Sequence, residues 1–308
     1  MKPVKRKVII SCAVTGRMHT PSMSENLPCS PEQITQQSID AARAGASILH
    51  LHARNPSDGS PTSDPAIFDL VLPRLAEGTD AIIVTPASPG PVSGPPDLRS
   101  IQMGSTNHTF SKAARGISDW NFAWEKPYLE ASEDGVLRNS FRDMKSALAG
   151  SAARPGCWLF ECHDLGHLYN LAQLVGEGLV NAPLFIEFSL GIAGGLNSDP
   201  ENLFLMRSTA DRLFGRQNYE FSVMAAGRHQ ISLVTMAAIM GGHARVGLGD
   251  SLYLGKGLLA TSNAAQVLKI RRILEDLSLE IATPDETRAI LQIEGPAASA
   301  YKEAGSNG

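Results

Sequence analysis

The sequence has no long hydrophobic run and little net charge, and each absence excludes a class of protein. No stretch of the 308 residues approaches the roughly 18 apolar residues that a membrane-spanning helix needs. A formal net charge of -4 gives no electrostatic basis for binding nucleic acid or an anionic membrane. We therefore expect no nucleic-acid partner and no membrane partner.

Cysteine is also scarce. The four cysteines form no C-x-x-C motif, and Cys12 and Cys162 lie in or beside apolar, strand-like runs, where we expect buried structural thiols. The basic residues between Lys2 and Lys7 precede only about six apolar residues, which is short for the apolar core of a signal peptide. These features predict a soluble protein in a reduced, cytoplasmic setting.

Short apolar runs alternate with longer amphipathic ones along the chain, as in repeated βα units with a parallel sheet. Eight strands with interleaved helices favour a closed barrel, so we predict an α/β fold of the TIM (β/α)8 type, with residues 1–308 forming a single domain. The predicted strands are 8–14, 47–53, 81–85, 98–103, 157–162, 184–190, 219–224 and 244–248, with a further short strand at 136–138. The predicted helices are 30–44, 64–76, 140–149, 165 onward, 199–213, 228–240, 262–276 and 284–292.

Two segments depart from a regular barrel. The run from Pro86 to Pro96 is so rich in proline and glycine that the third βα unit is predicted to be truncated, with no helix. An insertion at about 107–135 carries Trp120, Trp124 and Tyr128. We expect these aromatic side chains to pack the insertion rather than to bind a ligand.

Two histidines stand out in the run SILHLHARNPSDG. Side chains alternate along a strand, so His50 and His52 point to the same face, just before a turn-forming sequence. Neutral imidazoles that share a face could hold a divalent metal, or they could be buried histidines hydrogen-bonded to backbone. Both interpretations remain open at this point. The carboxyl end of a strand is where the active site of an α/β protein usually lies.

Charged residues also gather after the fifth and eighth predicted strands. Glu161 follows the fifth, and Arg245 and Asp250 lie near the end of the eighth. A carboxylate held by an arginine has a fixed geometry and charge, as a general base requires, although a salt bridge closing the barrel would use the same residues.

Two loops could bind an anion. Glycines between Gly191 and Leu196 would let backbone N–H groups approach a phosphate, but glycines are also ordinary turn residues. Arg228, after the seventh strand, could bind a carboxylate or phosphate with two hydrogen bonds, or could be a surface arginine near a helix start.

Taken in order, several motifs resemble the β-keto acid cleavage enzymes over nearly the whole chain. They are CAVTGRMHTPSMSENLPCSPEQI, AGASILHLHARNPSDGSPTSDP, FECHDLGHLYNLA, GIAGG, AAGRHQ and HARVGLGDSLYLGKGLLATSNA. The resemblance implies a TIM barrel that forms a homo-oligomer, in this case a tetramer. It also implies Zn²⁺ or another divalent metal, and the conversion of a β-keto acid plus acetyl-CoA into acetoacetate plus a new acyl-CoA.

The resemblance further assigns roles to individual residues. It implies metal ligands at His50 and His52, a general base at Asp250, an arginine that positions this base at Arg245, an acid at Glu161, and hydroxyls for the substrate carboxylate at Thr85 and Ser100.

The chain departs from the family pattern at three places. Gly249 stands where the family has a glutamate as third metal ligand, and Pro86-Ala87-Ser88 replaces a Thr-Gly-Gly turn. Met18 stands where the aminohexanoate-cleaving member has a glutamate that pairs with the substrate amine, which favours a substrate without a positively charged tail.

The departure at Gly249 keeps other functions open. One alternative is a catalytically weakened family member that acts as a ligand-binding protein, because Gly249 supplies no side-chain ligand. Another is a different metal-dependent barrel enzyme, such as an aldolase or hydrolase.

Overall fold

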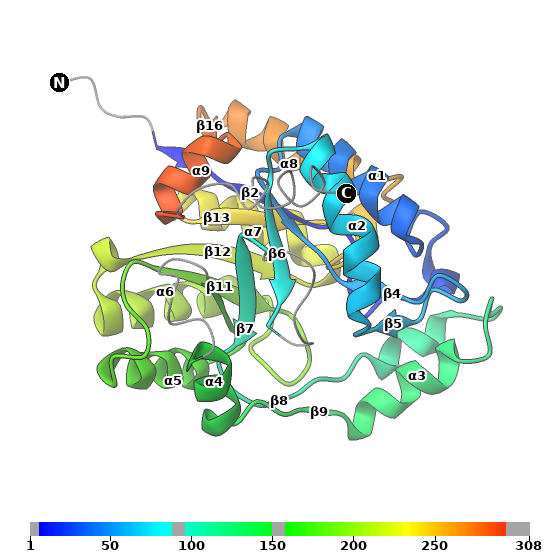
Figure 1. Cartoon of the computed structure of the whole chain (residues 1–308), viewed down its shortest axis with the longest axis horizontal. Helices are drawn as coiled ribbons and strands as arrows, with labels where there is room; N and C mark the ends of the chain where they lie inside the picture. The colour runs from blue at the N-terminus through cyan, green and yellow to red at the C-terminus, as the bar shows by residue number, and fades with distance from the viewer. Residues whose placement is uncertain (1–5, 88–95, 150–157, 294–308) are drawn as a thin grey trace, which may run out of the picture.

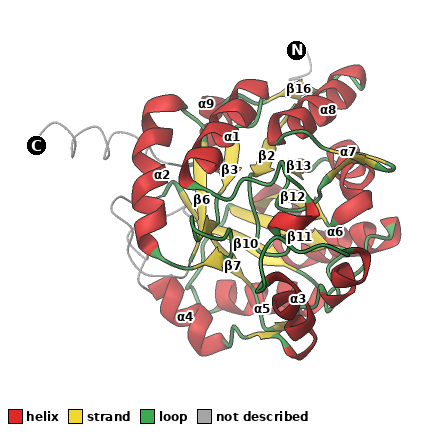
Figure 2. Cartoon of the chain, turned by 90° about the vertical axis from the view of Figure 1, so that its right-hand side faces the viewer, coloured by secondary structure: helices red, strands yellow, loops and turns green. Residues whose placement is uncertain are grey.

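The computed structural model describes residues 6–87, 96–149 and 158–293, and its centre is a closed barrel of eight parallel strands. The predicted TIM-barrel fold is therefore correct. Figure 2 looks toward the ring of strands with helices arranged around it. The barrel strands are β2 (Ile10–Ala13), β3 (Ile48–His50), β6 (Ile82–Pro86), β7 (Leu98–Gln102), β10 (Trp158–Cys162), β11 (Leu184–Leu190), β12 (Tyr219–Ala225) and β13 (His243–Val246).

Helices follow most of these strands and cover the outside of the barrel. They are α1 (Pro31–Ala44), α2 (Pro65–Gly78), α4 (Phe141–Ala149), α5 (Leu165–Gly176), α6 (Pro200–Phe214), α7 (Gln230–Ile239), α8 (Asn263–Asp276) and α9 (Pro284–Leu291), with α3 (Glu125–Ala131) in the insertion. Within the described ranges, no helix has the length and apolar character to cross a membrane.

Local sequence signals explain where the first helices begin and end. The Ser30 side chain accepts a hydrogen bond from the Gln33 N–H at the start of α1, and the Asp64 side chain caps α2 in the same way through Ala66. Gly45 ends α1 with a φ of 122°, a conformation that residues with a side chain rarely adopt. The predicted starts of both helices are therefore confirmed.

The amino-terminal end of the barrel interior is filled by apolar side chains. Ile9, Ile48, Ile82 and Phe185 form one buried cluster there, and residues of α9 pack against it. Because this end is closed, the opposite end, where the strands finish, is the end that can hold a cavity.

The first predicted strand is broken in two, which the sequence did not indicate. The Ile9 N–H donates to Nδ1 of His243 rather than to a neighbouring strand, at 3.1 Å. Before this break β1 (Lys7–Val8) pairs with β16 (Glu280–Ile281), and after it β2 joins the barrel. Three further pairs of short strands lie outside the barrel: β4 (Ala53–Arg54) with β5 (Pro61–Thr62), β8 (Thr106–Asn107) with β9 (Val136–Leu137), and β14 (Tyr253–Gly255) with β15 (Leu258–Leu259).

The insertion folds back onto the barrel rim. In Figure 1 α3 lies beside β4 and β5, far from it in the sequence. Trp124 packs edge-on against Tyr128 and donates to the Asp58 carbonyl at 3.2 Å. Glu125, fully buried, accepts hydrogen bonds from the N–H and hydroxyl of Ser22, both at 2.8 Å. The predicted packing role of Trp124 and Tyr128 is confirmed.

The truncated third unit is only partly described. β6 ends at Pro86 and β7 begins at Leu98, and most of the proline-rich run between them lies outside the described residues. The same is true of Cys157, the first residue of the predicted fifth strand.

Candidate active site

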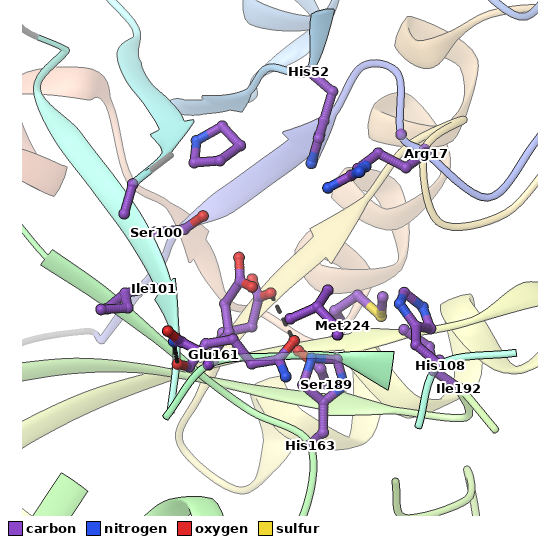
Figure 3. A pocket seen from close by; sticks show the side chains of 18 of the residues that line it. Arg17, His52, Ser100, Ile101, His108, Glu161, His163, Ser189, Ile192 and Met224 are labelled. Carbon is purple, nitrogen blue, oxygen red and sulfur yellow. Dashed lines mark hydrogen bonds between the residues drawn. The ribbon is translucent and has the colours of Figure 1, made fainter. Parts of the chain in front are cut away.

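A cavity of about 500 Å³ lies at the carboxyl ends of the barrel strands. Its walls come from several strands and from the loop after β2, and they carry most of the residues predicted to be functional. In Figure 3 Arg17 and His52 reach the cavity from one side, and Glu161 and Ser189 from the other. Members of the predicted set that line it are Met18, His52, Ser100, Glu161, Arg245 and Asp250.

Arg245 is the centre of the polar network. Its Nε and Nη2 donate to the two carboxylate oxygens of Asp250 at 2.8 and 2.9 Å, so the pair is bidentate. Its Nη1 donates to Glu187 at 2.7 Å and lies 3.2 Å from Nδ1 of His50. Burial alone would lower the pKa of Arg245, but the carboxylates of Asp250 and Glu187 raise it above its usual value. The arginine therefore fixes the position of the Asp250 carboxylate.

A second carboxylate pair lies beside this arginine. Strands β10 and β11 place Glu161 directly opposite Glu187 in their register. The pKa of Glu187 is raised to about 7. Burial is the main cause; Arg245 acts in the opposite direction, and the neighbouring Glu161 acts in the same direction as burial. Burial also raises the pKa of Glu161, with Arg245 and the Ser100 hydroxyl acting in the opposite direction. Glu187 can therefore hold a proton near neutral pH, as a general acid must, and the pKa of Glu161 is shifted in the same direction.

The two histidines stand at the end of β3 and directly after it, since the strand ends at His50 and His52 lies beyond it. His50 is buried inside the barrel, directly beyond the apolar cluster, and His52 is half-buried in the cavity wall. Burial lowers the pKa of both imidazoles, and Arg245 lowers it further; for His52 the value is about 3. Both rings are therefore neutral near pH 7.

The donor set does not fit the metal ion that the resemblance implies. His50 Nε2 and His52 Nδ1 are buried without a hydrogen-bond partner in the described structure. An arginine N–H can only donate, so the contact with Arg245 at 3.2 Å uses His50 Nδ1 as an acceptor, and the proton of the neutral ring then lies on Nε2. Gly249 offers no ligand, and the described residues contain no group of three or more His, Cys, Asp or Glu side chains arranged to hold a metal ion.

Two predicted substrate-binding residues lie away from the cavity. Thr85 is buried on β6 one position before Pro86, and because strand side chains alternate, Pro86 rather than Thr85 reaches the cavity. Arg228 is exposed after β12, and its Nε donates to His229 at 3.0 Å.

The glycine loop after β11 is a tight turn. Its Gly191 N–H donates to Leu196 O and its Gly195 N–H to Ile192 O, so these two amides are used within the loop. A Cβ at Gly194 would lie 1.6 Å from the Asn107 carbonyl oxygen, which explains the glycine there. These contacts favour the turn interpretation of this loop.

Sequence reasoning missed Glu187 and Arg17. Glu187 is the lone charged residue in the apolar run LFIEFSL, and a charge in a fully buried strand is a signal of function or pairing. Arg17 follows Gly16 directly after the first strand, at the end of the barrel where side chains meet the cavity.

The barrel and the arginine-held carboxylate at its carboxyl end together define a TIM-barrel enzyme. The chain belongs to the beta-keto acid cleavage enzyme family, whose model matches residues 7–293. This confirms the family to which the sequence motifs pointed.

Characterised relatives are similar over almost their full length. A 3,5-dioxohexanoate:acetyl-CoA acetone transferase of Paraburkholderia graminis is 46% identical, over 95% of this chain and 98% of that protein. A 3-keto-5-aminohexanoate cleavage enzyme of Fusobacterium nucleatum is 30% identical, over 94% of this chain and 98% of that protein. A 3-dehydrocarnitine:acetyl-CoA trimethylamine transferase of Rhizobium meliloti is also 30% identical, with the same coverage.

Solved structures share the fold. The apo structure of ObcA superposes with a TM-score of 0.60 and 16% identity, covering 88% of this chain and 66% of that chain. The chain is thus an enzyme that acts on β-keto acids, and the names of these relatives, all transferases or cleavage enzymes, give no support to a ligand-binding protein without activity.

Proposed function

We propose that this enzyme converts a β-keto acid and acetyl-CoA into acetoacetate and a new acyl-CoA. The observation that carries the proposal is Asp250, only 2% exposed, which lines the cavity with both oxygens held by Arg245. A carboxylate that an arginine fixes in place beside a cavity is suited to removing the α-proton of a keto acid.

The reaction follows from that proton transfer. Asp250 takes a proton from C2 of the keto acid, and the resulting carbanion attacks the thioester carbonyl of acetyl-CoA, which releases the CoA thiolate. The thiolate then attacks the original ketone carbon, and the C2–C3 bond of the keto acid breaks to give the new acyl-CoA. Asp250 returns its proton to the C2 carbanion, and acetoacetate leaves. Glu161, whose pKa burial raises, is placed to supply a proton to an oxygen that develops charge.

The tail of the substrate is proposed to be uncharged. Met18 lines the cavity at the position where the resemblance puts an amine-binding glutamate, so a cationic tail finds no partner there. The dioxohexanoate in the name of the 46% identical relative fits this expectation. Arg228 stays a predicted contact for a carboxylate or phosphate of the substrates, and a homo-oligomer stays a prediction from the resemblance.

Zn²⁺ has no part in this reaction scheme, because the donor set of His50, His52 and Gly249 does not fit it. The divalent ion that the resemblance implies is therefore not part of the function proposed for this chain.

The proposal is tested with acetyl-CoA labelled with ¹³C in its acetyl group and a panel of β-keto acids with neutral, anionic and cationic tails. We expect labelled acetoacetate and a new acyl-CoA, most rapidly with a neutral tail. Asp250→Asn should lower the rate at least a thousandfold, because the base is lost. Asp64→Asn, the same change at the cap of α2, is the matched control and should leave the rate unchanged. A folded protein that forms no acyl-CoA from any of these acids would refute the proposal.

A further inference from the structure

One cationic side chain in the cavity wall has no acidic partner. Arg17 lines the cavity, and no hydrogen bond or ion pair joins its guanidinium to another part of the described structure. The other two arginines of the wall are engaged: Arg245 with Asp250 and Glu187, and Arg138 with Asp143 at 3.7 Å. Arg17 is thus the wall arginine that remains available to an anionic ligand.

The backbone that carries Arg17 is held by three hydrogen bonds from two side chains. The fully buried Arg54 donates to the carbonyls of Gly16 and His19, at 2.7 and 2.8 Å. The Tyr128 hydroxyl of the insertion donates to the carbonyl of Arg17 itself at 2.7 Å. Because this loop is already fixed, its backbone loses little further freedom when the Arg17 side chain binds a ligand.

The position of this loop depends on glycine at 249. A Cβ on Gly16 would lie 2.7 Å from the Gly249 carbonyl oxygen, and a Cβ on Gly249 would lie 3.0 Å from Ala13 O and from the carbonyl carbon of Thr15. The two backbones therefore touch directly. Gly249 stands where the resemblance implies a glutamate ligand. The same glycine allows the Arg17 loop to lie against the end of β13.

A ligand that carries a carboxylate needs a positively charged partner in this cavity. Four carboxyl side chains line the cavity, Asp143, Glu161, Glu187 and Asp250, and Arg245 already donates hydrogen bonds to two of them, Glu187 and Asp250. A β-keto acid brings one more carboxylate into this acidic cavity, where a cation that is not already paired would stabilise it.

From this arrangement, and resting on the proposed function, we infer that Arg17 binds the carboxylate of the β-keto acid and supplies the positive charge for which a divalent ion would otherwise be needed. A guanidinium presents two parallel N–H donors to a carboxylate, a geometry suited to this task. Keto-acid binding by this enzyme is consequently independent of metal.

The test is equilibrium binding of acetoacetate, measured by titration calorimetry on full-length protein dialysed against a chelator and then repeated with added Zn²⁺. We expect the same Kd in both conditions. Arg17→Gln should weaken binding at least tenfold, while Arg17→Lys, which keeps the charge but loses the paired donors, should weaken it severalfold. Arg43→Gln, at an exposed position on α1, is the control for loss of one positive charge and should bind as the wild type does.

Two outcomes overturn the inference: acetoacetate binding that appears only when Zn²⁺ is added, or an unchanged Kd in Arg17→Gln with an unaltered melting temperature. The acyl-transfer assay separates this result from the proposed function. If acyl-CoA forms but the Kd is unchanged in Arg17→Gln, the proposed function is supported and the role of Arg17 is refuted. If binding depends on Arg17 but no acyl-CoA forms, the role of Arg17 is supported and the proposed function is refuted.

Discussion

The two ends of the barrel interior are made by the same strands and differ completely in chemistry. On β3 the apolar Ile48 is followed two residues later by His50, and on β11 Phe185 is followed by Glu187. Because strand side chains alternate, each pair lies on one face, one layer apart. The apolar layer closes the barrel, and the next layer holds the charges that line the cavity. The comparison shows that side chains only two positions apart on one strand have different tasks: the first stabilises the fold by packing, and the second takes part in the chemistry.

The strongest way to sharpen this comparison is to remove Arg245 from the charged layer. In Arg245→Ala, Asp250 and Glu187 lose their shared partner while still buried. We expect activity to fall at least a thousandfold and the free energy of unfolding to drop by about 3–5 kcal/mol. Urea unfolding and steady-state kinetics measure the two effects. Arg245→Lys, which keeps one charge, should restore part of the stability but little activity; a change in stability of less than about 1 kcal/mol in the alanine variant would contradict the account.

The matching change in the apolar layer should affect stability alone. Phe185→Ala removes a ring that is 5% exposed, and the resulting cavity should lower the free energy of unfolding by about 3 kcal/mol. The kcat of the folded variant should stay within twofold of the wild type, measured well below its unfolding transition. Phe185→Leu is the milder control. A large loss of kcat in folded Phe185→Ala would break the separation of the two layers.

The charged layer should also make stability depend on pH. The folded pKa of Glu187, about 7, lies above its ordinary value of 4.5, so between these values the folded state binds the proton more tightly than the unfolded state. The contribution is fully present below about pH 4.5 and is lost as the pH rises through about 7, by roughly 3 kcal/mol at most. Glu187→Gln should flatten the wild-type curve in this window, whereas the exposed Glu77→Gln should not. Identical slopes in wild type and Glu187→Gln would refute this assignment.

The smallest expected effect concerns the insertion. Tyr128→Phe removes the hydroxyl that holds the Arg17 carbonyl but keeps the ring between Phe110 and Trp124. We expect a loss of about 1 kcal/mol in stability and a KM for the keto acid raised a fewfold, with kcat unchanged. Trp124→Phe, which loses the bond to Asp58, is the comparison; equal effects on KM would show that the hydroxyl has no special role.

Much of this arrangement could be predicted from local sequence. Periodicity predicted all eight barrel strands and most helix boundaries. Asp250 could be linked to Arg245 because only five residues separate them.

What could not be predicted depends on contacts between distant segments. Glu161 meets Glu187 through the register of two strands, and the protonated nitrogen of His50 follows from an arginine 195 residues away. The break at Ile9 likewise needs a side chain from the last barrel strand. Neither propensity nor spacing carries this information, because each contact exists only once the barrel has closed.

The contact between Gly16 and Gly249 has an evolutionary consequence. With the two backbones touching, any side chain at 249 would require the loop after β2 to move by several tenths of an ångström, and Arg54 holds that loop in place. A single mutation that introduces an acidic residue at 249 is therefore disfavoured unless other substitutions relax the loop first. The glycine is entrenched: the order in which mutations can accumulate, and not only their final combination, limits the routes open to descendants of this sequence.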